Sequence, residues 1–184
     1  MDLNNLSDVF GRAIKDYHNG KDAVIETYSS IGGWDELPVK YLFRSFEEMP
    51  DIEQTALKMA FGKVLDLGCG AGSHSLYLKD KGLEVKPIDI SEGAIEVCKL
   101  RGLDHAEMIN LWDLKNVQYD TILALMNGAG ICGSMKKIPD FLKHLKSLLA
   151  PGGQILMDSS DVIYMFEDES GEVDLSEVNH YYGE

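Results

Sequence analysis

The sequence predicts an α/β fold in which a mostly parallel sheet is covered by helices on both faces. Two observations carry this prediction. Strand-like and helix-like patterns alternate from residue 63 onward, and a glycine-rich turn joins the first of these strands to the first helix. Such alternation favours parallel strands joined by crossover helices. The expected strands cover residues 63–67, 84–90, 107–111, 119–126 and 154–158, and the expected helices cover residues 73–81, 91–100 and 138–149.

Glycine and proline mark the ends of these helices. Gly82 and Gly102 follow the first two, and glycine is favoured there because it enters the left-handed conformation at little cost. The last helix carries one continuous apolar stripe, and the turn at residues 151–153, Pro-Gly-Gly, ends it. We therefore expect residues 61–160 to form a single ligand-binding domain.

Residues 1–60 have a different texture and are expected to form an N-terminal helical lid over the open end of the sheet. Apolar residues recur at helical spacing over residues 6–17. A second short helix is expected at residues 23–28. A third is expected to begin at Asp51, which forms a capping-box pattern with Gln54.

Residues 161–184 are expected to form an acidic loop and the start of a truncated C-terminal part. They contain eight Asp or Glu and no Lys or Arg, so they cannot bury much apolar surface. The strand at residues 154–158 would then be an exposed sheet edge. Because such an edge favours pairing with another chain, the sequence allows a homo-oligomer.

Composition narrows the function. The net charge is −14, from 31 acidic and 17 basic residues, which argues against nucleic acid as the main partner. No apolar run approaches the roughly 20 residues of a membrane helix, and the first residues lack the features of a secretory signal. The three cysteines are widely spaced, which suits a cytoplasmic protein without structural zinc, and we expect no metal site.

The glycine-rich turn is the most informative segment. Glycines at positions 68, 70 and 72 let the backbone turn sharply and approach a ligand. Asp89 ends the next expected strand, where a carboxylate can accept hydrogen bonds from both ribose hydroxyls. A dinucleotide site would want its third glycine one place later, where Ser73 stands, and the carboxylate of Asp66 would repel a pyrophosphate. A zwitterionic sulfonium ligand would instead favour a nearby carboxylate.

Residues 66–72 resemble the D-x-G-x-G-x-G signature of the class I S-adenosylmethionine-dependent methyltransferases. Residues 88–91, Ile-Asp-Ile-Ser, and residues 149–153, Leu-Ala-Pro-Gly-Gly, match later landmarks of that family in the right order. The similarity covers roughly residues 60–160. It implies a Rossmann-like sheet. That family's sheet normally has seven strands ending in an antiparallel hairpin, and only five are expected here, so the terminal hairpin is predicted to be missing.

The resemblance also implies a set of cofactor contacts. The loop from Gly68 to Gly72 would lie against the methionine portion and the ribose, and Asp89 would hold the ribose hydroxyls. Asn110 stands where the family usually has an acid that contacts the adenine amine, with Asp113 as a substitute, and Asn127 lies where the family places groups near the reactive methyl. The predicted S-adenosylmethionine contacts are Asp66, Leu67, Gly68, Cys69, Gly70, Gly72, Asp89, Ile90, Asn110, Leu111, Trp112, Met126 and Asn127.

The predicted function is transfer of a methyl group from S-adenosylmethionine to a small-molecule acceptor. The alternative is a non-catalytic S-adenosylmethionine-binding module or subunit. An NAD-dependent oxidoreductase is disfavoured by Ser73 and Asp66. No position identifies a general base: His74 is expected to face solvent or to cap the first turn of its helix, and Cys69 to be a small filler in the turn.

Overall fold

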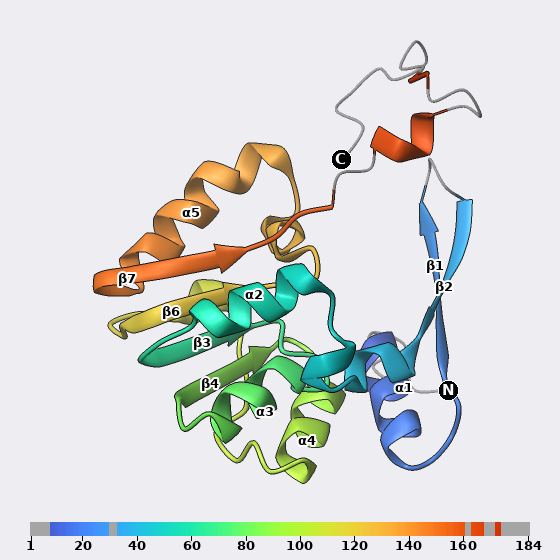
Figure 1. Cartoon of the computed structure of the whole chain (residues 1–184), viewed down its shortest axis with the longest axis horizontal. Coiled ribbons are helices and arrows are strands. Elements are labelled where there is room, and N and C mark those ends of the chain that lie inside the picture. The colour runs from blue at the N-terminus through green and yellow to red at the C-terminus, as the bar shows by residue number, and fades with distance from the viewer. Residues whose placement is uncertain (1–7, 30–32, 161–162, 168–171, 174–184) are drawn as a thin grey trace.

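The computed structural model describes residues 8–29, 33–160, 163–167 and 172–173. It contains a five-stranded parallel sheet with strand order β5-β4-β3-β6-β7 and a separate two-stranded antiparallel hairpin, β1-β2 (Figure 1). The strands are β1 (Val24–Ser29), β2 (Gly33–Pro38), β3 (Lys63–Leu67), β4 (Glu84–Asp89), β5 (Glu107–Met108), β6 (Tyr119–Ala124) and β7 (Leu149–Met157). The α-helices are α1 (Val9–His18), α2 (Asp51–Met59), α3 (Ser73–Asp80), α4 (Glu92–Leu100) and α5 (Ile138–Ser147).

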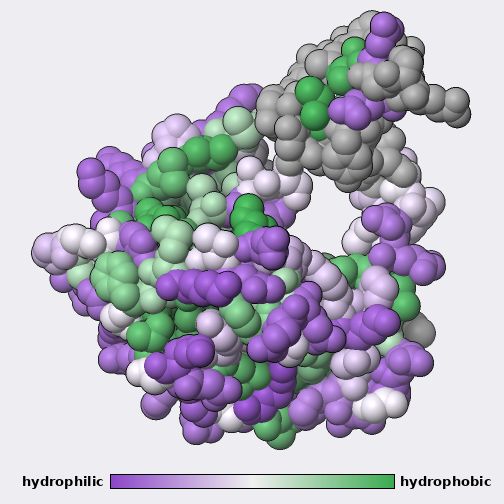
Figure 2. Space-filling model, viewed as in Figure 1, coloured by the Kyte–Doolittle hydropathy of each residue, from purple (hydrophilic) through white to green (hydrophobic). Residues whose placement is uncertain are grey.

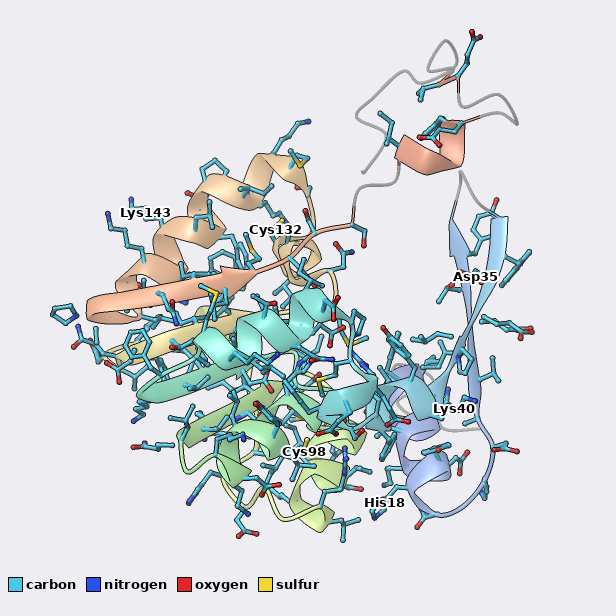
Figure 3. All side chains as sticks on the ribbon, viewed as in Figure 1. His18, Asp35, Lys40, Cys98, Cys132 and Lys143 are labelled. Atoms are coloured by element: carbon cyan, nitrogen blue, oxygen red, sulfur yellow. The ribbon has the colours of Figure 1, made fainter. Side chains whose placement is uncertain are left out.

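Helices cover both faces of the main sheet, as the sequence predicts. Successive residues of a strand point to opposite faces. Val64 of β3 packs in one cluster with residues of α2 and α3, whereas Leu65 packs in another with Phe141 and Leu145 of α5. On the outer side of α5, Lys143 points away from the sheet into solvent (Figure 3). The predicted Rossmann-like α/β fold is therefore confirmed.

Two expected strands differ in length from the prediction. Residues 107–111 were expected as a strand, but β5 stops at Met108. The side chain of Asn110 accepts a hydrogen bond from the Trp112 backbone N–H at 3.1 Å, and this starts a short 3-10 helix. β7 begins at Leu149, five residues before the expected Gln154, and its pairing with β6 shifts register near Tyr119.

The N-terminal region is not the all-helical lid that the sequence predicts. Residues 23–28 were expected as a helix and instead supply most of β1, which pairs with β2 from Val24↔Pro38 to Ser29↔Gly33. Figure 1 shows this hairpin projecting from the body of the molecule, and Figure 3 shows Asp35 on its outer part. The predicted capping role of Asp51 is also wrong. Pro50 is the N-cap of α2, and the Gln54 side chain donates to the backbone oxygen of Met49 instead.

Helix α1 packs against α4 through two glycines. A methyl group on Gly93 would lie 2.6 Å from the backbone of Gly11, so only glycine permits the contact. Asp8, the N-cap of α1, links the starts of both helices: one carboxylate oxygen accepts from the Gly11 N–H at 2.9 Å, and the other accepts from the Gly93 N–H in the first turn of α4 at 3.0 Å. These bonds fix α1 beside the carboxyl end of β4, where the site lies.

Beyond β7 the structure describes little of the region that was expected to be an acidic loop. Ile163–Phe166 form a 3-10 helix, and Glu167 makes an antiparallel bridge to Val173. The remainder of residues 161–184 lies outside the described residues, as does the start of the helix predicted from residue 6. Within the described ranges, no strand other than β6 pairs with β7.

The surface is mixed in character. Figure 2 shows mainly hydrophilic residues over α3 and α4, and hydrophobic residues gathered nearer α5 and β7. None of the helices in the described part of the chain is long and apolar enough to cross a membrane.

Candidate cofactor-binding site

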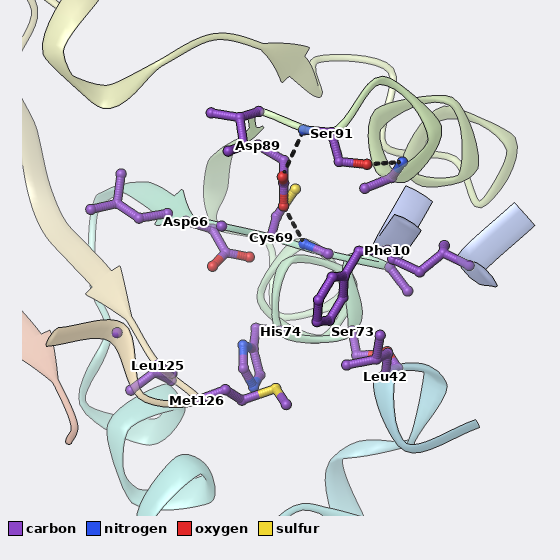
Figure 4. Close-up of a pocket in the computed structure, with 18 of the residues that line it drawn as sticks. Phe10, Leu42, Asp66, Cys69, Ser73, His74, Asp89, Ser91, Leu125 and Met126 are labelled. Atoms are coloured by element: carbon purple, nitrogen blue, oxygen red, sulfur yellow. Dashed lines mark hydrogen bonds between the residues drawn. The ribbon is translucent and has the colours of Figure 1, made fainter. Parts of the chain in front are cut away.

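A cleft of about 630 Å³ opens at the carboxyl ends of β3, β4 and β6 (Figure 4). Open parallel sheets bind ligands at this edge, because loops of variable sequence meet there above a rigid frame. Of the thirteen predicted cofactor contacts, nine line the cleft: Asp66, Leu67, Gly68, Cys69, Gly70, Asp89, Ile90, Met126 and Asn127.

The turn after β3 forms one wall of the cleft. Gly68 and Gly70 have φ values of +66° and +52°, in the left-handed region that a side chain disfavours. A methyl group added to Gly70 would meet no atom within 4 Å, so the backbone there borders open space. A ligand can therefore approach the backbone of this turn closely.

Gly72, also a predicted cofactor contact, has close neighbours within the protein. It does not line the cleft, and a methyl group on it would lie 2.5 Å from Leu103 and 3.0 Å from the Cys98 sulfur. Its φ of +83° ends the turn, and it is the N-cap of α3. The third glycine of the motif therefore packs the turn against the region of α4, and it is not among the residues that line the cleft.

Asp89 is held at one end of the cleft by two backbone donors. Its Oδ2 accepts from the Gly70 N–H and its Oδ1 from the Ser91 N–H, both at 2.9 Å (Figure 4). Each carboxylate oxygen has more than one acceptor position, so both can take a further hydrogen bond from a ligand. The adjacent Ile90 is 74% exposed at the mouth of the cleft.

Asp66 lies deeper than Asp89. Its side chain is almost fully buried and accepts a hydrogen bond from the Ser75 hydroxyl at 2.6 Å. Burial raises the pKa of Asp66 above its ordinary value, while the nearby His74 and the Ser75 hydrogen bond oppose that rise. The first acid of the motif therefore belongs to a buried hydrogen-bonded group at the floor of the cleft.

The opposite wall includes a strained turn after β6. Met126 and Asn127 have φ values of +61° and +63°, which are uncommon for residues with side chains. Asp158, at the end of β7, holds this turn: its two carboxylate oxygens accept from the N–H groups of Met126 and Gly128, each at 2.9 Å. Asp158 was not predicted as a site residue, although an acid that ends an expected strand beside the predicted site is a usable signal.

Three further predicted cofactor contacts lie away from the cleft. Asn110, Leu111 and Trp112 are absent from its lining. The Asn110 side chain bonds to the Trp112 backbone, Leu111 is buried in the core on the α5 side, and the Trp112 ring packs against His144 at 5.2 Å between centroids. The structure therefore does not bring this group together with the other predicted contacts.

A buried ionic cluster at the cleft was not predicted. Arg44 and Glu53 form a salt bridge, and the same Glu53 oxygen lies 2.6 Å from Nε2 of His74. All three side chains are buried, with His74 only 9% exposed, so its predicted solvent-facing position is wrong. Arg44 and His74 line the cleft. No local pattern could reveal the cluster, because its members come from three separate segments of the chain.

The N-terminal segments supply the remaining wall. Val9 and Phe10 of α1 line the cleft, together with Leu37 and Leu42 from the hairpin and the turn that follows it. Figure 4 shows the Phe10 ring directed into the pocket. Among the described residues no group of His, Cys, Asp or Glu side chains is arranged to hold a metal ion.

The fold and the cleft define the class as a Rossmann-like nucleotide-binding domain, and comparison with known proteins identifies the family. Residues 40–174 match the family model of the methyltransferase domain, so the chain belongs to that family. The crystal structure of a SAM-dependent methyltransferase from Bacteroides fragilis, in complex with S-adenosyl-L-homocysteine, is 49% identical. It superposes with a TM-score of 0.83 over 90% of this chain and 70% of its own.

Curated relatives are more distant. Methyltransferase GfsG of Streptomyces halstedii is 28% identical over 82% of this chain and 58% of its own length. The ubiquinone biosynthesis O-methyltransferase of Idiomarina loihiensis is 28% identical over 54% of this chain and 43% of its own length. The chain thus spans about half the length of these curated relatives.

Proposed function

We propose that this protein binds S-adenosylmethionine in the cleft and transfers its methyl group to a small-molecule acceptor. The observation that carries the proposal is the Asp89 carboxylate, fixed by the N–H groups of Gly70 and Ser91 at the end of β4. A carboxylate held this way is ready to accept the two hydroxyl hydrogens of a ribose. The bound adenosylhomocysteine of the Bacteroides fragilis relative supports the same cofactor class.

The charges of the cleft fit the amino-acid end of the cofactor. Arg44 is the only Lys or Arg among the residues that line it. Its Nε is buried and lacks a hydrogen-bond partner within the described residues, and a buried donor of this kind gains from an added acceptor. In our proposal the methionine carboxylate bonds to Arg44 while the ribose bonds to Asp89. The glycine turn, which leaves open space at Gly70, then lies against the part of the cofactor that joins the ribose to the carboxylate.

When bound, the cofactor supplies an activated methyl group on a positively charged sulfur. The protein's task is then to hold donor and acceptor in line and to exclude water, and alignment of this kind can lower a barrier by about 7–11 kcal/mol at most. The apolar side chains of Val9, Phe10 and Met126 line the cleft and favour the exclusion of water. A lid role for the N-terminal residues is part of this proposal.

The proposed acceptor is a small molecule. The relatives include proteins named ubiquinone biosynthesis O-methyltransferase and malonyl-[acyl-carrier protein] O-methyltransferase, and the −14 charge of this chain argues against a polyanionic acceptor. Three buried free cysteines suit a reducing compartment, which supports a cytoplasmic location. No specific feature of the described residues favours a non-catalytic binding module or NAD over this proposal.

Isothermal titration calorimetry tests the cofactor assignment. The protein should bind S-adenosylmethionine and S-adenosylhomocysteine, and NAD at least tenfold more weakly. Adenosine and free methionine, titrated separately, serve as controls for the two halves of the site. Tighter binding of NAD than of either sulfur ligand would overturn the proposal.

A further inference from the structure

The strongest unexplained feature is the buried group of Glu53 on α2 and His74 on α3. Nε2 of His74 lies 2.6 Å from the Glu53 carboxylate, and no hydrogen bond is formed by Nδ1 of His74 within the described part of the chain. His74 nevertheless lines the cleft, on the side of the pocket where Met126 lies (Figure 4). A carboxylate on one ring nitrogen and a free second nitrogen together make the arrangement of an oriented general base.

The protonation state of Glu53 suits this arrangement. Burial acts to raise its pKa, but hydrogen bonds from His74 and Arg44 and the charges of both outweigh it, so the pKa lies below its ordinary value. Glu53 is therefore ionised at neutral pH, and a neutral His74 that donates to it from Nε2–H keeps a lone pair on Nδ1. The other charged groups near the ring are Arg44, from the turn after the hairpin, and Asp66 on β3.

In the proposed placement of the cofactor, His74 lies at the methionine end of the cleft. The sulfonium of S-adenosylmethionine lies between its ribose and its carboxylate, which we assign to Asp89 and Arg44. Arg44 shares the Glu53 carboxylate with His74, so the imidazole stands at the methionine end of the cleft. Figure 4 shows His74 near Met126, with Asp89 toward the opposite side of the drawn pocket.

We propose that His74 is the general base of methyl transfer, that Glu53 is its positioning residue, and that the acceptor is a hydroxyl group. This inference rests on the proposed function. The acceptor oxygen attacks the methyl carbon and forms the new O–C bond. The C–S bond breaks with its electron pair moving to sulfur, which becomes a neutral thioether. The hydroxyl proton passes to Nδ1 of His74, and the ionised Glu53 stabilises the resulting imidazolium.

The acceptor class follows from the need for a base. A neutral amine has a free lone pair and can attack the methyl group before it loses a proton. A hydroxyl is a weak nucleophile until its proton is removed in or before the transition state, and a positioned base then contributes about 10²–10⁴-fold. The Glu53–His74 pair in the cleft therefore favours an acceptor that is methylated on a hydroxyl oxygen.

Histidine NMR tests the base directly and needs no acceptor. In ¹⁵N-histidine-labelled full-length protein saturated with S-adenosylhomocysteine, His74 should carry its proton on Nε2 at pH 8, with Nδ1 unprotonated. The His74→Gln spectrum assigns its signals, and exposed His105 serves as an internal reference. In the Glu53→Gln variant, the proton of the neutral His74 ring should no longer prefer Nε2. A wild-type His74 protonated on Nδ1 would overturn the inference, because that nitrogen could not accept a proton.

A kinetic measurement separates catalysis from support of the fold. With catechol as the hydroxyl probe, His74→Gln should lower kcat about 100-fold or more, change the calorimetric affinity for S-adenosylhomocysteine less than twofold, and abolish the acidic limb of the pH–rate profile. His105→Gln should change none of these. Unaltered kcat in His74→Gln, or methylation of benzylamine but not catechol by the wild type, would contradict a base for hydroxyl acceptors. Failure to bind adenosylhomocysteine at all would instead contradict the proposed function.

Discussion

At the scale of single residues, the cleft is organised by carboxylates that stand at strand ends. Asp89, at the end of β4, ties the glycine turn to the start of α4. Asp158, beyond the end of β7, ties down the strained turn at Met126. Each carboxylate satisfies backbone N–H groups that would otherwise be unpaired, and each fixes a loop that borders the cleft. The loops that border the cleft are therefore positioned by the same kind of group that we propose to hold the ribose.

Replacing Asp89 should weaken cofactor binding. Asp89→Ala removes two charge-assisted hydrogen bonds to the proposed ribose, each worth about 1.5–3 kcal/mol. We expect the affinity for S-adenosylhomocysteine, measured by calorimetry, to fall at least tenfold while the protein remains folded. Asp104→Ala, an exposed acid outside the cleft, is the matched control. Equal affinities of Asp89→Ala and wild type would reassign Asp89 to loop structure alone.

The cysteine of the glycine turn should be unreactive. The Sγ atoms of Cys69 and Cys98 lie 3.7 Å apart, and this contact is the largest cause that raises the pKa of Cys69 well above its usual value. Burial of the thiol raises the pKa further. Because the thiolate is the reactive form, we expect little iodoacetamide labelling of Cys69 in folded protein at pH 7.5 and full labelling in urea, measured by peptide mass spectrometry. Labelling of native Cys69 as fast as that of a free cysteine peptide would be inconsistent with this burial.

The residues of the cleft differ in how far the sequence could predict them. Gly68, Gly70 and Asp89 were predictable because carboxyl ends of parallel strands meet at one edge and a short motif names them. Arg44 was not predictable, since it pairs with Glu53, which also pairs with His74, only through the folding of separate segments. Asn110 was predicted as a cofactor contact because it follows an expected strand. Its side chain instead accepts a hydrogen bond from the Trp112 backbone N–H, and a short 3-10 helix begins there.

At the scale of elements, the helices and strands that were predicted correctly are those whose apolar residues follow a clear periodic pattern. The core strands and the helices of the main domain bury one or both faces and were predicted within a few residues. The β1 strand was mistaken for a helix because Ile25 is its only buried residue among Val24 to Tyr28, so it shows no alternating pattern. Pairing across the hairpin, including the Tyr28–Trp34 ring contact at 5.3 Å, holds it instead.

The α1–α4 contact is the element-scale feature most open to test. Gly93→Ala would place a methyl group 2.6 Å from the Gly11 backbone, which cannot yield as a flexible side chain can. We expect a loss of about 1–3 kcal/mol in the free energy of unfolding by urea, typical of overpacking. Cofactor affinity should also fall, because α1 carries the cleft residue Phe10.

The control for this substitution lies on the same helix. Lys99→Ala changes an exposed residue of α4 and should leave both stability and cofactor affinity near their wild-type values. A fully stable Gly93→Ala variant would mean that α1 does not pack on α4 in solution as it does in the structure.

At the scale of the whole molecule, Glu53 joins the N-terminal region to the main domain through Arg44 and His74. Its pKa lies below the ordinary value of 4.5, since the hydrogen bonds and charges of His74 and Arg44 outweigh the effect of burial. A group with a lowered folded-state pKa contributes stability that is present above its unfolded pKa and is lost as the pH falls through its folded pKa. Asp66, whose pKa is raised by burial, acts in the opposite direction.

Glu53→Gln should therefore destabilise the protein in a pH-dependent way. At pH 7 breaking a buried ion pair should cost roughly 3 kcal/mol or more in urea unfolding. The difference between wild type and variant should shrink as the pH falls below about 4.5, because the carboxyl is protonated first in the unfolded protein and then, at its lower pKa, in the folded protein. Exposed Glu47→Gln should show little difference at either pH. A Glu53→Gln deficit that stays constant from pH 7 to acid would exclude the ionised carboxylate as its cause.

The most direct measurement of the central claim is a crystal structure of the full chain soaked with S-adenosylhomocysteine. We expect density for the ligand in the cleft, with both ribose hydroxyls within hydrogen-bonding distance of Asp89 and the carboxylate at Arg44. A ligand bound elsewhere, or one whose ribose lies away from Asp89, would contradict the proposed cofactor site.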